Sequence, residues 1–241
     1  MPLLGCSSAA NELFGALMPC KRTLAALAMP LFLLPGLMLA DDASWKRVAS
    51  TEGIQVFARD VEGSDVREVK AIARIDAPPG RILAALDDID SYTETMPYTE
   101  VARVVKREGN STWMYTVINA PIVSRRDYCI KLTASRLPDG TLKYEWEPAN
   151  EYAPSESVGV RVEVTRGHWL LRPVDGGKAT QAEYYVYTDP GGGLPRWVIN
   201  RANNTAVPDV VKAVRAAAKS DRYAKVSHPL TGSVSDTEAD N

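Results

Sequence analysis

Between residues 45 and 188 the chain consists of short segments in which apolar and polar residues alternate, separated by turn signals. A period of two is typical of β-strands that bury one face, and it is clearest at residues 54–59 and 69–75. The other predicted strands cover residues 99–107, 111–118, 126–136, 141–147, 160–172 and 179–188. The sequence therefore predicts one large antiparallel sheet.

The turns between these segments indicate how the strands are connected. Residues 137–141 (LPDGT) and 174–177 (VDGG) have the composition of tight hairpin turns. Hairpins join strands that are neighbours in both the sequence and the sheet, so we expect the sheet to be mostly a meander.

Two segments have the period of a helix instead. The first covers residues 79–89, and Pro79 suits its first turn. The second, after the glycine-rich residues 189–193, runs from Leu194 to about Lys219, and we expect Pro208 to kink it. A long helix after one antiparallel sheet predicts an α+β domain over residues 45–220, in which the sheet curves around the helix.

The face of the sheet that meets this helix is predicted to be apolar and aromatic. By strand parity it carries Trp113, Tyr115, Val117, Tyr128, Ile130, Leu132, Leu142, Tyr144, Trp146, Ala182, Tyr184, Val186 and Thr188. Two interpretations stay open at this point. These side chains either pack a solid core or enclose a cavity.

The charge and the cysteine and histidine content exclude several classes of protein. Lys and Arg number 28 against 30 Asp and Glu, a formal net charge of -2, so no basic surface for nucleic acid is indicated. The three cysteines, Cys6, Cys20 and Cys129, lack paired metal-type spacing, and the chain has two histidines, His168 and His228. A zinc site is therefore not expected, and no cofactor is predicted.

Residues 1–40 have the pattern of an export signal. Lys21 and Arg22 precede an apolar run that ends at Ala40, which favours a cleaved signal peptide and a periplasmic or secreted protein. A retained membrane anchor is the alternative, because the run is almost long enough to span a bilayer and Met38 is not the small residue that signal peptidase prefers. Met18 could be the true start, and lipidation of Cys6 is a disfavoured option. At the other end, residues 227–241 are predicted to be disordered.

The order of motifs resembles the START family of lipid-binding domains. The stretches that carry the resemblance are 96–97 (MP), 119–121 (NAP), 124–128 (SRRDY), 159–161 (GVR), 167–173 (GHWLLRP) and 189–200 (DPGGGLPRWVIN). The resemblance implies a helix-grip fold with an internal hydrophobic tunnel, and binding and transfer of a lipid or sterol without catalysis. Some members place a buried acid and a buried arginine in the tunnel. In an ungapped register these positions fall on Trp113 and Leu132, so that polar anchor is absent here.

The predicted site lies on the inner face of the sheet and on the long helix. The predicted ligand-binding residues are Trp113, Tyr115, Val117, Tyr128, Ile130, Leu132, Tyr144, Trp146, Tyr184, Val186, Trp197 and Val198. The protein is predicted to carry a lipid, sterol or similar hydrophobic molecule between membranes, with transient membrane contact and no nucleic acid partner. The alternatives are a cyclase-type enzyme that acts on a polyketide-like substrate and a quinone-binding accessory protein.

Charged and reactive side chains in the predicted domain are interpreted as structural. His168 and Cys129 are not expected to form a catalytic pair. Arg126 and Asp127 are expected to tie down a loop, and Arg161 is a candidate for a buried ion pair whose partner the sequence does not name.

Overall fold

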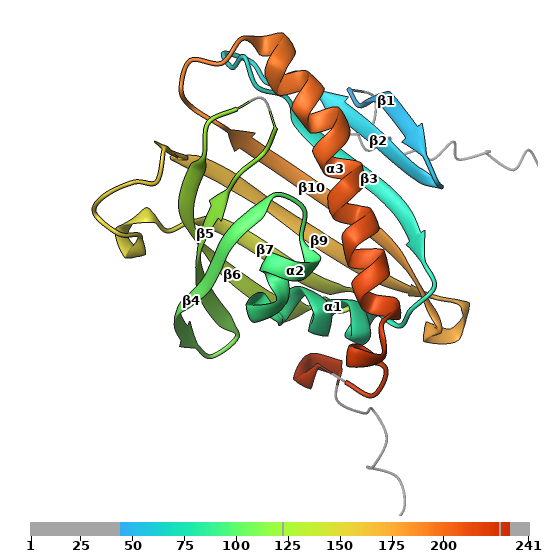
Figure 1. Cartoon of the computed structure of the whole chain (residues 1–241). Coiled ribbons are helices and arrows are strands. Elements are labelled where there is room, and N and C mark those ends of the chain that lie inside the picture. Colours follow the sequence, from blue (N-terminus) through green and yellow to red (C-terminus); the bar gives the residue numbers. More distant parts are fainter. Residues whose placement is uncertain (1–43, 122, 227, 232–241) are drawn as a thin grey trace, which may run out of the picture. The chain divides into compact units, whose positions relative to one another are not determined.

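The computed structural model describes residues 44–121, 123–226 and 228–231 (Figure 1). Its strands are β1 (Lys46–Thr51), β2 (Ile54–Arg59), β3 (Glu68–Ile75), β4 (Thr99–Glu108), β5 (Ser111–Ile118), β6 (Arg126–Arg136), β7 (Leu142–Pro148), β8 (Val160–Arg161), β9 (Val164–Val174) and β10 (Ala179–Asp189). Its α-helices are α1 (Pro79–Asp87), α2 (Tyr92–Thr95) and α3 (Arg196–Lys219). Short 3₁₀ turns lie at Ile89–Ser91, Asn150–Tyr152, Asp175–Gly177, Asp221–Tyr223 and Pro229–Thr231.

All ten strands belong to one sheet, in the order β1-β2-β3-β10-β9-β7-β6-β5-β4, with β8 paired to β6 beside this path. The neighbours along the path are antiparallel, and the pair of β6 and β8 is parallel. The strands from β4 to β10 form the predicted meander, and β3 closes onto β10. The result is a curved sheet that wraps around α3, as predicted (Figure 1).

The core fills the space between the concave face of the sheet and the helices. From α3 it receives Val207, Val211, Val214 and Ala218, which recur at helical spacing on one face of the helix. From α1 it receives Ile82, Leu83 and Leu86. The N-terminal half of α3, by contrast, contributes only Ile199 to the buried residues before Val207. The two halves of the helix therefore meet the sheet differently.

The predicted elements agree with the observed ones except at a few positions. Strand β1 was not predicted, and the predicted strand at 160–172 is divided into β8 and β9. Helix α3 continues through Pro208. Among the described residues no helix combines the length and the apolar character needed to cross a bilayer.

Two predicted terminal segments fall largely outside the described residues. The predicted signal peptide or anchor at 1–40 lies entirely outside them, and so does most of the predicted disordered tail at 227–241. Pro229–Thr231 is described and forms a 3₁₀ turn, with Leu230 against the core, so the prediction of disorder is wrong for these residues.

The face assigned to β5 is also wrong. Trp113, Tyr115 and Val117 pair across the sheet with Lys131, Cys129 and Asp127, on the face opposite to Tyr128. Residues 149–163, including β8, cover this outer face, and residues 112–117 are buried whichever way they point. Because both faces of β5 are buried, alternation in its sequence does not reveal which residues face α3. The inner face is formed by Thr112, Met114, Thr116 and Ile118.

Trp113 therefore belongs to a small cluster outside the main core. It packs with Cys129, Ala149 and Ala153, and its ring lies 5.6 Å from that of Tyr152. Trp113 was predicted to line the tunnel, but it lies on the opposite, outer face of the sheet. Leu132 does face inward, and Thr112 lies opposite it on β5.

Candidate functional site

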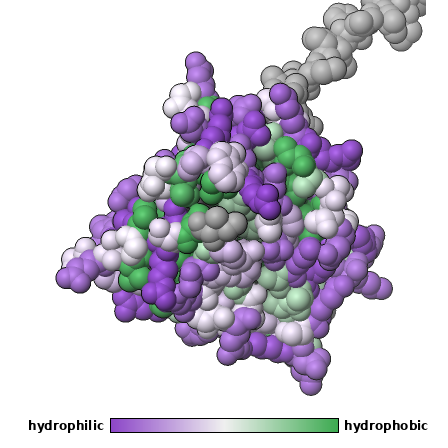
Figure 2. Space-filling view, turned by 45° about the horizontal axis from the view of Figure 1, so that its top comes forward, coloured by the Kyte–Doolittle hydropathy of each residue, from purple (hydrophilic) through white to green (hydrophobic). Residues whose placement is uncertain are grey.

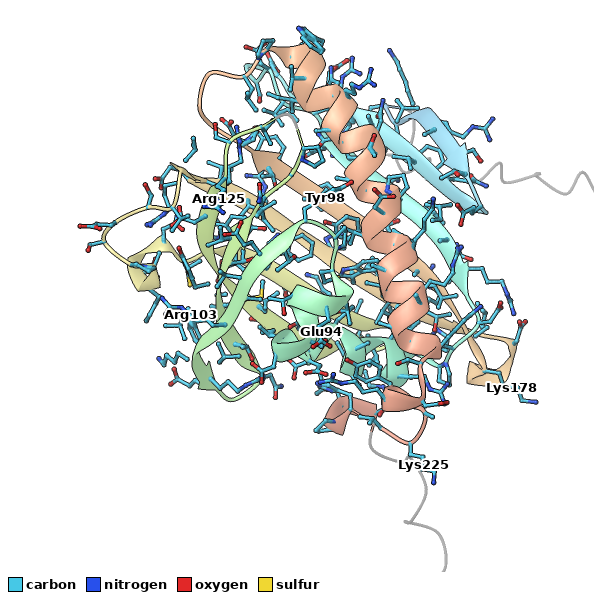
Figure 3. The ribbon with its side chains drawn as sticks, viewed as in Figure 1. Glu94, Tyr98, Arg103, Arg125, Lys178 and Lys225 are labelled. Carbon is cyan, nitrogen blue, oxygen red and sulfur yellow. The ribbon has the colours of Figure 1, made fainter. Side chains whose placement is uncertain are left out.

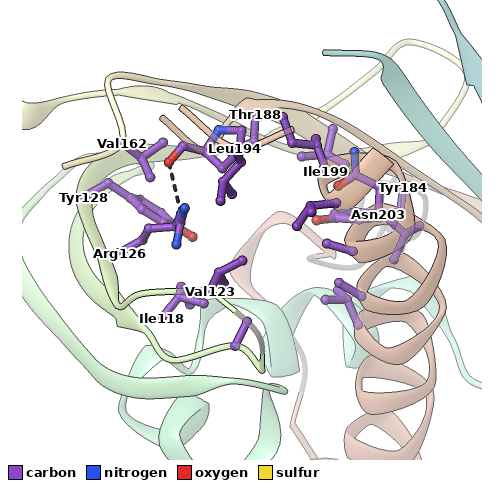
Figure 4. Close-up of a pocket in the computed structure, with 18 residues that line it drawn as sticks. Ile118, Val123, Arg126, Tyr128, Val162, Tyr184, Thr188, Leu194, Ile199 and Asn203 are labelled. Atoms are coloured by element: carbon purple, nitrogen blue, oxygen red, sulfur yellow. Dashed lines mark hydrogen bonds between the residues drawn. The ribbon is translucent and has the colours of Figure 1, made fainter. Parts of the chain in front are cut away.

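A cavity of about 210 Å³ lies between the N-terminal half of α3 and the concave face of the sheet (Figure 4). Its walls come from β5, β6 and β10, from the two loops at 119–125 and 190–195, and from α3. The lining residues are Ile118, Ala120, Val123, Arg126, Tyr128, Val162, Tyr184, Val186, Thr188, Pro190, Leu194, Val198, Ile199, Ala202, Asn203, Ala206, Val207 and Val210.

A second cavity of about 180 Å³ lies deeper under the sheet and shares part of its wall with the first. The shared residues are Ile118, Tyr128, Tyr184, Val186, Thr188 and Val210. Beyond them the inner cavity is bounded by α1, α2 and β7, through Leu86, Tyr92, Met96, Tyr144 and Trp146. The two cavities therefore adjoin each other across these residues, and we call them the outer and the inner cavity.

Most of the predicted ligand-binding residues lie in these walls. The lining includes Tyr128, Ile130, Leu132, Tyr144, Trp146, Tyr184, Val186 and Val198. Trp113, Tyr115 and Val117 lie on the other face of the sheet for the reason given above. Trp197 is 67% exposed and borders a separate groove on the surface.

Several lining residues were not predicted. On β5 these are Met114, Thr116 and Ile118, which the wrong parity placed outside. On α3 they include Ala202 and Ala206. These residues follow Val198 at intervals of four, so the helical period of the sequence could have placed them on the same face as Val198. The small side chains of these two alanines leave room between helix and sheet.

The titratable side chains that line the outer cavity are one arginine and two tyrosines. Burial raises the pKa of Tyr128 to about 12. Burial, and the proximity of Tyr128, raise the pKa of Tyr184 well above its usual range. Among the described residues, no Asp, Glu or His borders either cavity. The described walls therefore suit the binding of an apolar ligand. They present no side chain whose pKa would allow proton transfer near neutral pH.

Arg126 occupies the first position of β6, and its side chain turns into the outer cavity (Figure 4). It is 7% exposed. Its Nε donates to the carbonyl of Pro190 at 3.0 Å, and its Nη1 donates to the carbonyl of Ser124. These two bonds connect both loops at this end of the cavity, which agrees with the predicted role in tying down a loop.

Asp127, the next residue, points to the opposite face because successive strand residues alternate. Its carboxylate accepts two hydrogen bonds from Arg161, both at 2.9 Å, and one from the Tyr115 hydroxyl. This confirms the predicted buried ion pair of Arg161 and identifies its partner. Burial by itself would raise the pKa of Asp127, but hydrogen bonds from Arg161, the Val158 amide and Tyr115 outweigh it and lower the pKa.

Cys129 and His168 do not form a reactive pair. Cys129 is fully buried among Trp113 and Ala149, and burial raises the pKa of its thiol to about 11. His168 stacks on Tyr185 at 5.0 Å and lies 3.5 Å from Glu183. Both side chains have structural surroundings, as predicted.

The thiol of Cys129 is expected to be protected in the folded protein. Since the thiolate is the reactive form, iodoacetamide at mildly alkaline pH should modify Cys129 at least about tenfold more slowly than in the unfolded chain. Peptide mapping by mass spectrometry measures this residue separately from Cys6 and Cys20. Equal rates in the folded and unfolded states would show that Cys129 is accessible.

Comparisons with known proteins found similarity to one group of proteins. The profile of a family described as polyketide cyclase / dehydrase and lipid transport matches residues 75–215. A Pseudomonas aeruginosa protein, described as uncharacterized, is 30% identical over 194 residues, which cover 80% of this chain and 95% of that protein.

Two solved structures are also similar. A STAR-related lipid transfer protein fragment from Xanthomonas axonopodis is 26% identical and superposes with a TM-score of 0.69, covering 73% of this chain and 99% of the fragment. Human StAR-related lipid transfer protein 5 has the same fold at 15% identity and a TM-score of 0.68, over 75% of this chain and 88% of that one.

Proposed function

The chain is a START-like member of the polyketide cyclase / dehydrase and lipid transport family, and from this premise we propose that it carries a lipid or sterol-like molecule between membranes. The observation that supports this most is the pair of adjoining, largely apolar cavities between α3 and the sheet. Transferring a hydrocarbon chain from water into such a space is favourable by about 0.8 kcal/mol per methylene. A bound molecule would lie in the outer and inner cavities together.

The side chains that line the two cavities do not favour the cyclase-type alternative. A cyclase that works by acid-base chemistry needs a group whose pKa lies near the working pH, and the described walls offer an arginine and tyrosines with raised pKa values. Binding and release of an unchanged molecule requires no acid or base with a pKa near the working pH.

The test is identification of the molecule that accompanies the protein. Organic extraction of purified full-length protein, followed by mass spectrometry, should recover an intact lipid-like compound in a fixed ratio to protein. Recovery of a polyketide converted by the protein would favour the cyclase alternative. Absence of any apolar compound, together with no uptake from vesicles, would contradict the proposed carrier function.

The end of the domain at the start of α3 is where we propose that the carrier touches a membrane. A surface groove of about 120 Å³ lies here between the 119–125 loop and the helix, bordered by Tyr98, Pro121, Val123 and the exposed Trp197. Figure 2 views this end of the domain and shows hydrophobic residues grouped on the face, with hydrophilic residues around its edge. Arg201 also borders the groove and is suited to anionic head groups, whereas Arg196 contacts Asp60 and the Asp65 carbonyl.

The loop opposite this helix is anchored at one end through Asn119 and at the other through the ion pair of Arg125 with Glu100 at 2.9 Å. Tyr98 faces α3 (Figure 3), and its hydroxyl donates to Asp209 at 2.8 Å. The Asn119 amide donates to the Tyr98 carbonyl at 2.8 Å. Ala120 and Val123 of this loop line both the outer cavity and the groove, so their displacement would open a path from the groove to the cavity.

Replacing Trp197 by alanine is expected to slow transfer of a fluorescent lipid between vesicles about three- to tenfold. Trp197 loses little protein contact because it is 67% exposed, so thermal stability should stay within about 0.5 kcal/mol. Replacement of the exposed Val105 on β4 is the matched control and should leave transfer unchanged. An unchanged transfer rate for the Trp197 variant would exclude this end as the membrane contact.

The compartment is part of the same proposal. We propose that the protein is exported, on the strength of the basic pair Lys21-Arg22 and the apolar run that follows it. A reporter active only outside the cytoplasm, fused after Ser44, should be active. Polar replacement of the run at residues 31–34 should abolish that activity, and persistence of activity would contradict export.

A further inference from the structure

Arg126 presents more hydrogen-bond donors to the outer cavity than the protein satisfies. The guanidinium has five N–H groups. In the described part of the chain it donates to the carbonyls of Pro190 and Ser124, and Nη2 has no acceptor. The side chain nevertheless lies in a wall made otherwise almost entirely of apolar residues, with Ile118, Val123 and Val162 around it (Figure 4).

No carboxylate in the described residues neutralises this cation. Asp127 is held by Arg161 on the opposite face of β6. Glu100 pairs with Arg125 and also accepts from Asn119. Asp189 accepts from the amide of Gly191 within its own turn. Each acid near the two loops is thus engaged elsewhere.

A buried cation without a counter-ion is energetically unfavourable, and arginine stays protonated under all ordinary conditions. Burial lowers the pKa of Arg126, with no opposing effect from a nearby acid. An anionic group placed at Nη1 and Nη2 would satisfy the free donors and compensate the charge, and a planar carboxylate or a phosphate matches the fork of the guanidinium.

We propose that Arg126 anchors the head group of the ligand, and that the ligand is a single-chain amphiphile with an anionic oxygen head group, a carboxylate or phosphate monoester. The inference rests on the proposed function and adds the chemistry of the head group. The head group lies beside the two loops, and the apolar body extends past Tyr128 and Tyr184 into the inner cavity. There Leu132, Met114 and Trp169 offer apolar contact.

This position differs from the tunnel anchor that the family resemblance suggested. The inner cavity has Leu132 where that resemblance placed an arginine, so the polar end of the ligand has no partner at that depth. The loop over Arg126 places no side chain against Nη2 at Gly192. Gly192 has a φ of 72°, and a Cβ there would lie 3.6 Å from Nη2, so glycine keeps this side of the guanidinium free of a side chain.

The test compares ligands that share one hydrocarbon chain and differ in the head group. Palmitate, hexadecyl phosphate and hexadecanol are titrated against the full chain loaded with a neutral fluorescent probe, N-phenylnaphthylamine. In the wild type, palmitate or hexadecyl phosphate should displace the probe at concentrations at least about tenfold lower than hexadecanol, since charge-assisted hydrogen bonds are stronger than those between neutral groups. Inorganic phosphate should displace no probe.

Two arginine variants then assign the effect to one side chain. Arg126→Met should lose the preference for the anion, and Arg126→Lys should keep part of it. Arg125→Met is the matched control, because Arg125 is adjacent in sequence but exposed and paired with Glu100, and it should keep the full preference. Circular dichroism checks that each variant is folded, and the wild-type comparison stands by itself if Arg126→Met is not.

The outcomes separate this inference from the carrier function. Equal displacement by palmitate, hexadecyl phosphate and hexadecanol in the wild type would overturn the anionic head group while leaving the carrier intact. A preference that survives in Arg126→Met would overturn the role of Arg126. Displacement of the probe by inorganic phosphate at the concentrations effective for hexadecyl phosphate would overturn the proposed amphiphile, because the apolar body would add nothing. Failure of all three amphiphiles to displace the probe would instead count against the carrier function.

Discussion

Replacing Val186 by tryptophan is expected to lower the affinity for a hydrophobic ligand about a hundredfold while leaving the domain folded. Val186 lies on the inner face of β10 and lines both the outer and the inner cavity. Its neighbours across the sheet are Gly167 on β9 and Val69 on β3, and the Trp146 ring lies over Gly167. Because Val186 lines both cavities, the larger indole would extend into them where they adjoin and exclude the ligand from that space. A hundredfold loss corresponds to about 2.7 kcal/mol of binding free energy.

The same substitution in a filled part of the interior should behave differently. Val214 of α3 has no exposed surface and packs against the sheet, so Val214→Trp is expected to cost about 1–3 kcal/mol of stability or to prevent folding. Val186→Ile, which adds one methylene, should keep the ligand affinity within a few fold. Thermal unfolding and displacement of a fluorescent probe measure both quantities for each variant. If Val186→Trp lost as much stability as Val214→Trp, the interior would be a solid core and the carrier function would fail.

The strands and the long helix were predictable because each has a regular period in the sequence. The predicted strand at 126–136 matches β6, and the predicted helix differs from α3 by two residues at its start. Strand β1 was missed because its burial is slight and its residues show no clear alternation. Local periodicity thus accounts for most of the secondary structure.

The assignment of faces required information that the sequence does not contain locally. Residues 112–117 are all buried, since α3 and the inner core lie on one side of β5 and residues 149–163 lie on the other. Strand parity assigned Trp113 and Tyr115 to the inner face, but the pairing of β5 with β6 places them on the outer face, under residues 149–163. Only the pairing of β5 with β6 fixes the choice, and that pairing depends on the register of a folded sheet.

Arg126 shows the opposite case, in which the sequence held a signal that went unused. Tyr128 was correctly predicted to face the interior, and a period of two places Arg126 on the same face. Treating Arg126 and Asp127 as one structural pair obscured this, because adjacent residues in a strand point to opposite sides. The structure assigns Asp127 to the ion pair and Arg126 to the cavity.

The ion pair under the outer loop leads to the second large expected effect. Arg161→Met should lower the free energy of unfolding by roughly 3 kcal/mol, because it leaves the Asp127 carboxylate buried without its cation. Asp127 has no exposed side-chain surface, whereas the Arg161 side chain is 18% exposed, so the lower end of the range for a buried pair applies. In a domain of this size the melting temperature should fall by roughly 10 °C. Arg67→Met, which breaks an exposed pair with Asp60, should cost less than about 1 kcal/mol.

The dependence on pH distinguishes loss of the charge pair from loss of packing. In the wild type the pKa of Asp127 is lowered by folding, so its contribution to stability is present above the unfolded value of about 3.9 and is lost as the pH falls through the folded pKa. In Arg161→Met, burial without the cation should raise the pKa of Asp127, so the variant recovers stability relative to the wild type as the pH is lowered and the carboxyl becomes neutral. Adding Asp127→Asn to Arg161→Met should restore part of the loss at neutral pH. A difference between wild type and variant that stays constant with pH, and no recovery in the double variant, would mean that Arg161 stabilises the 149–163 segment through packing and not through its charge.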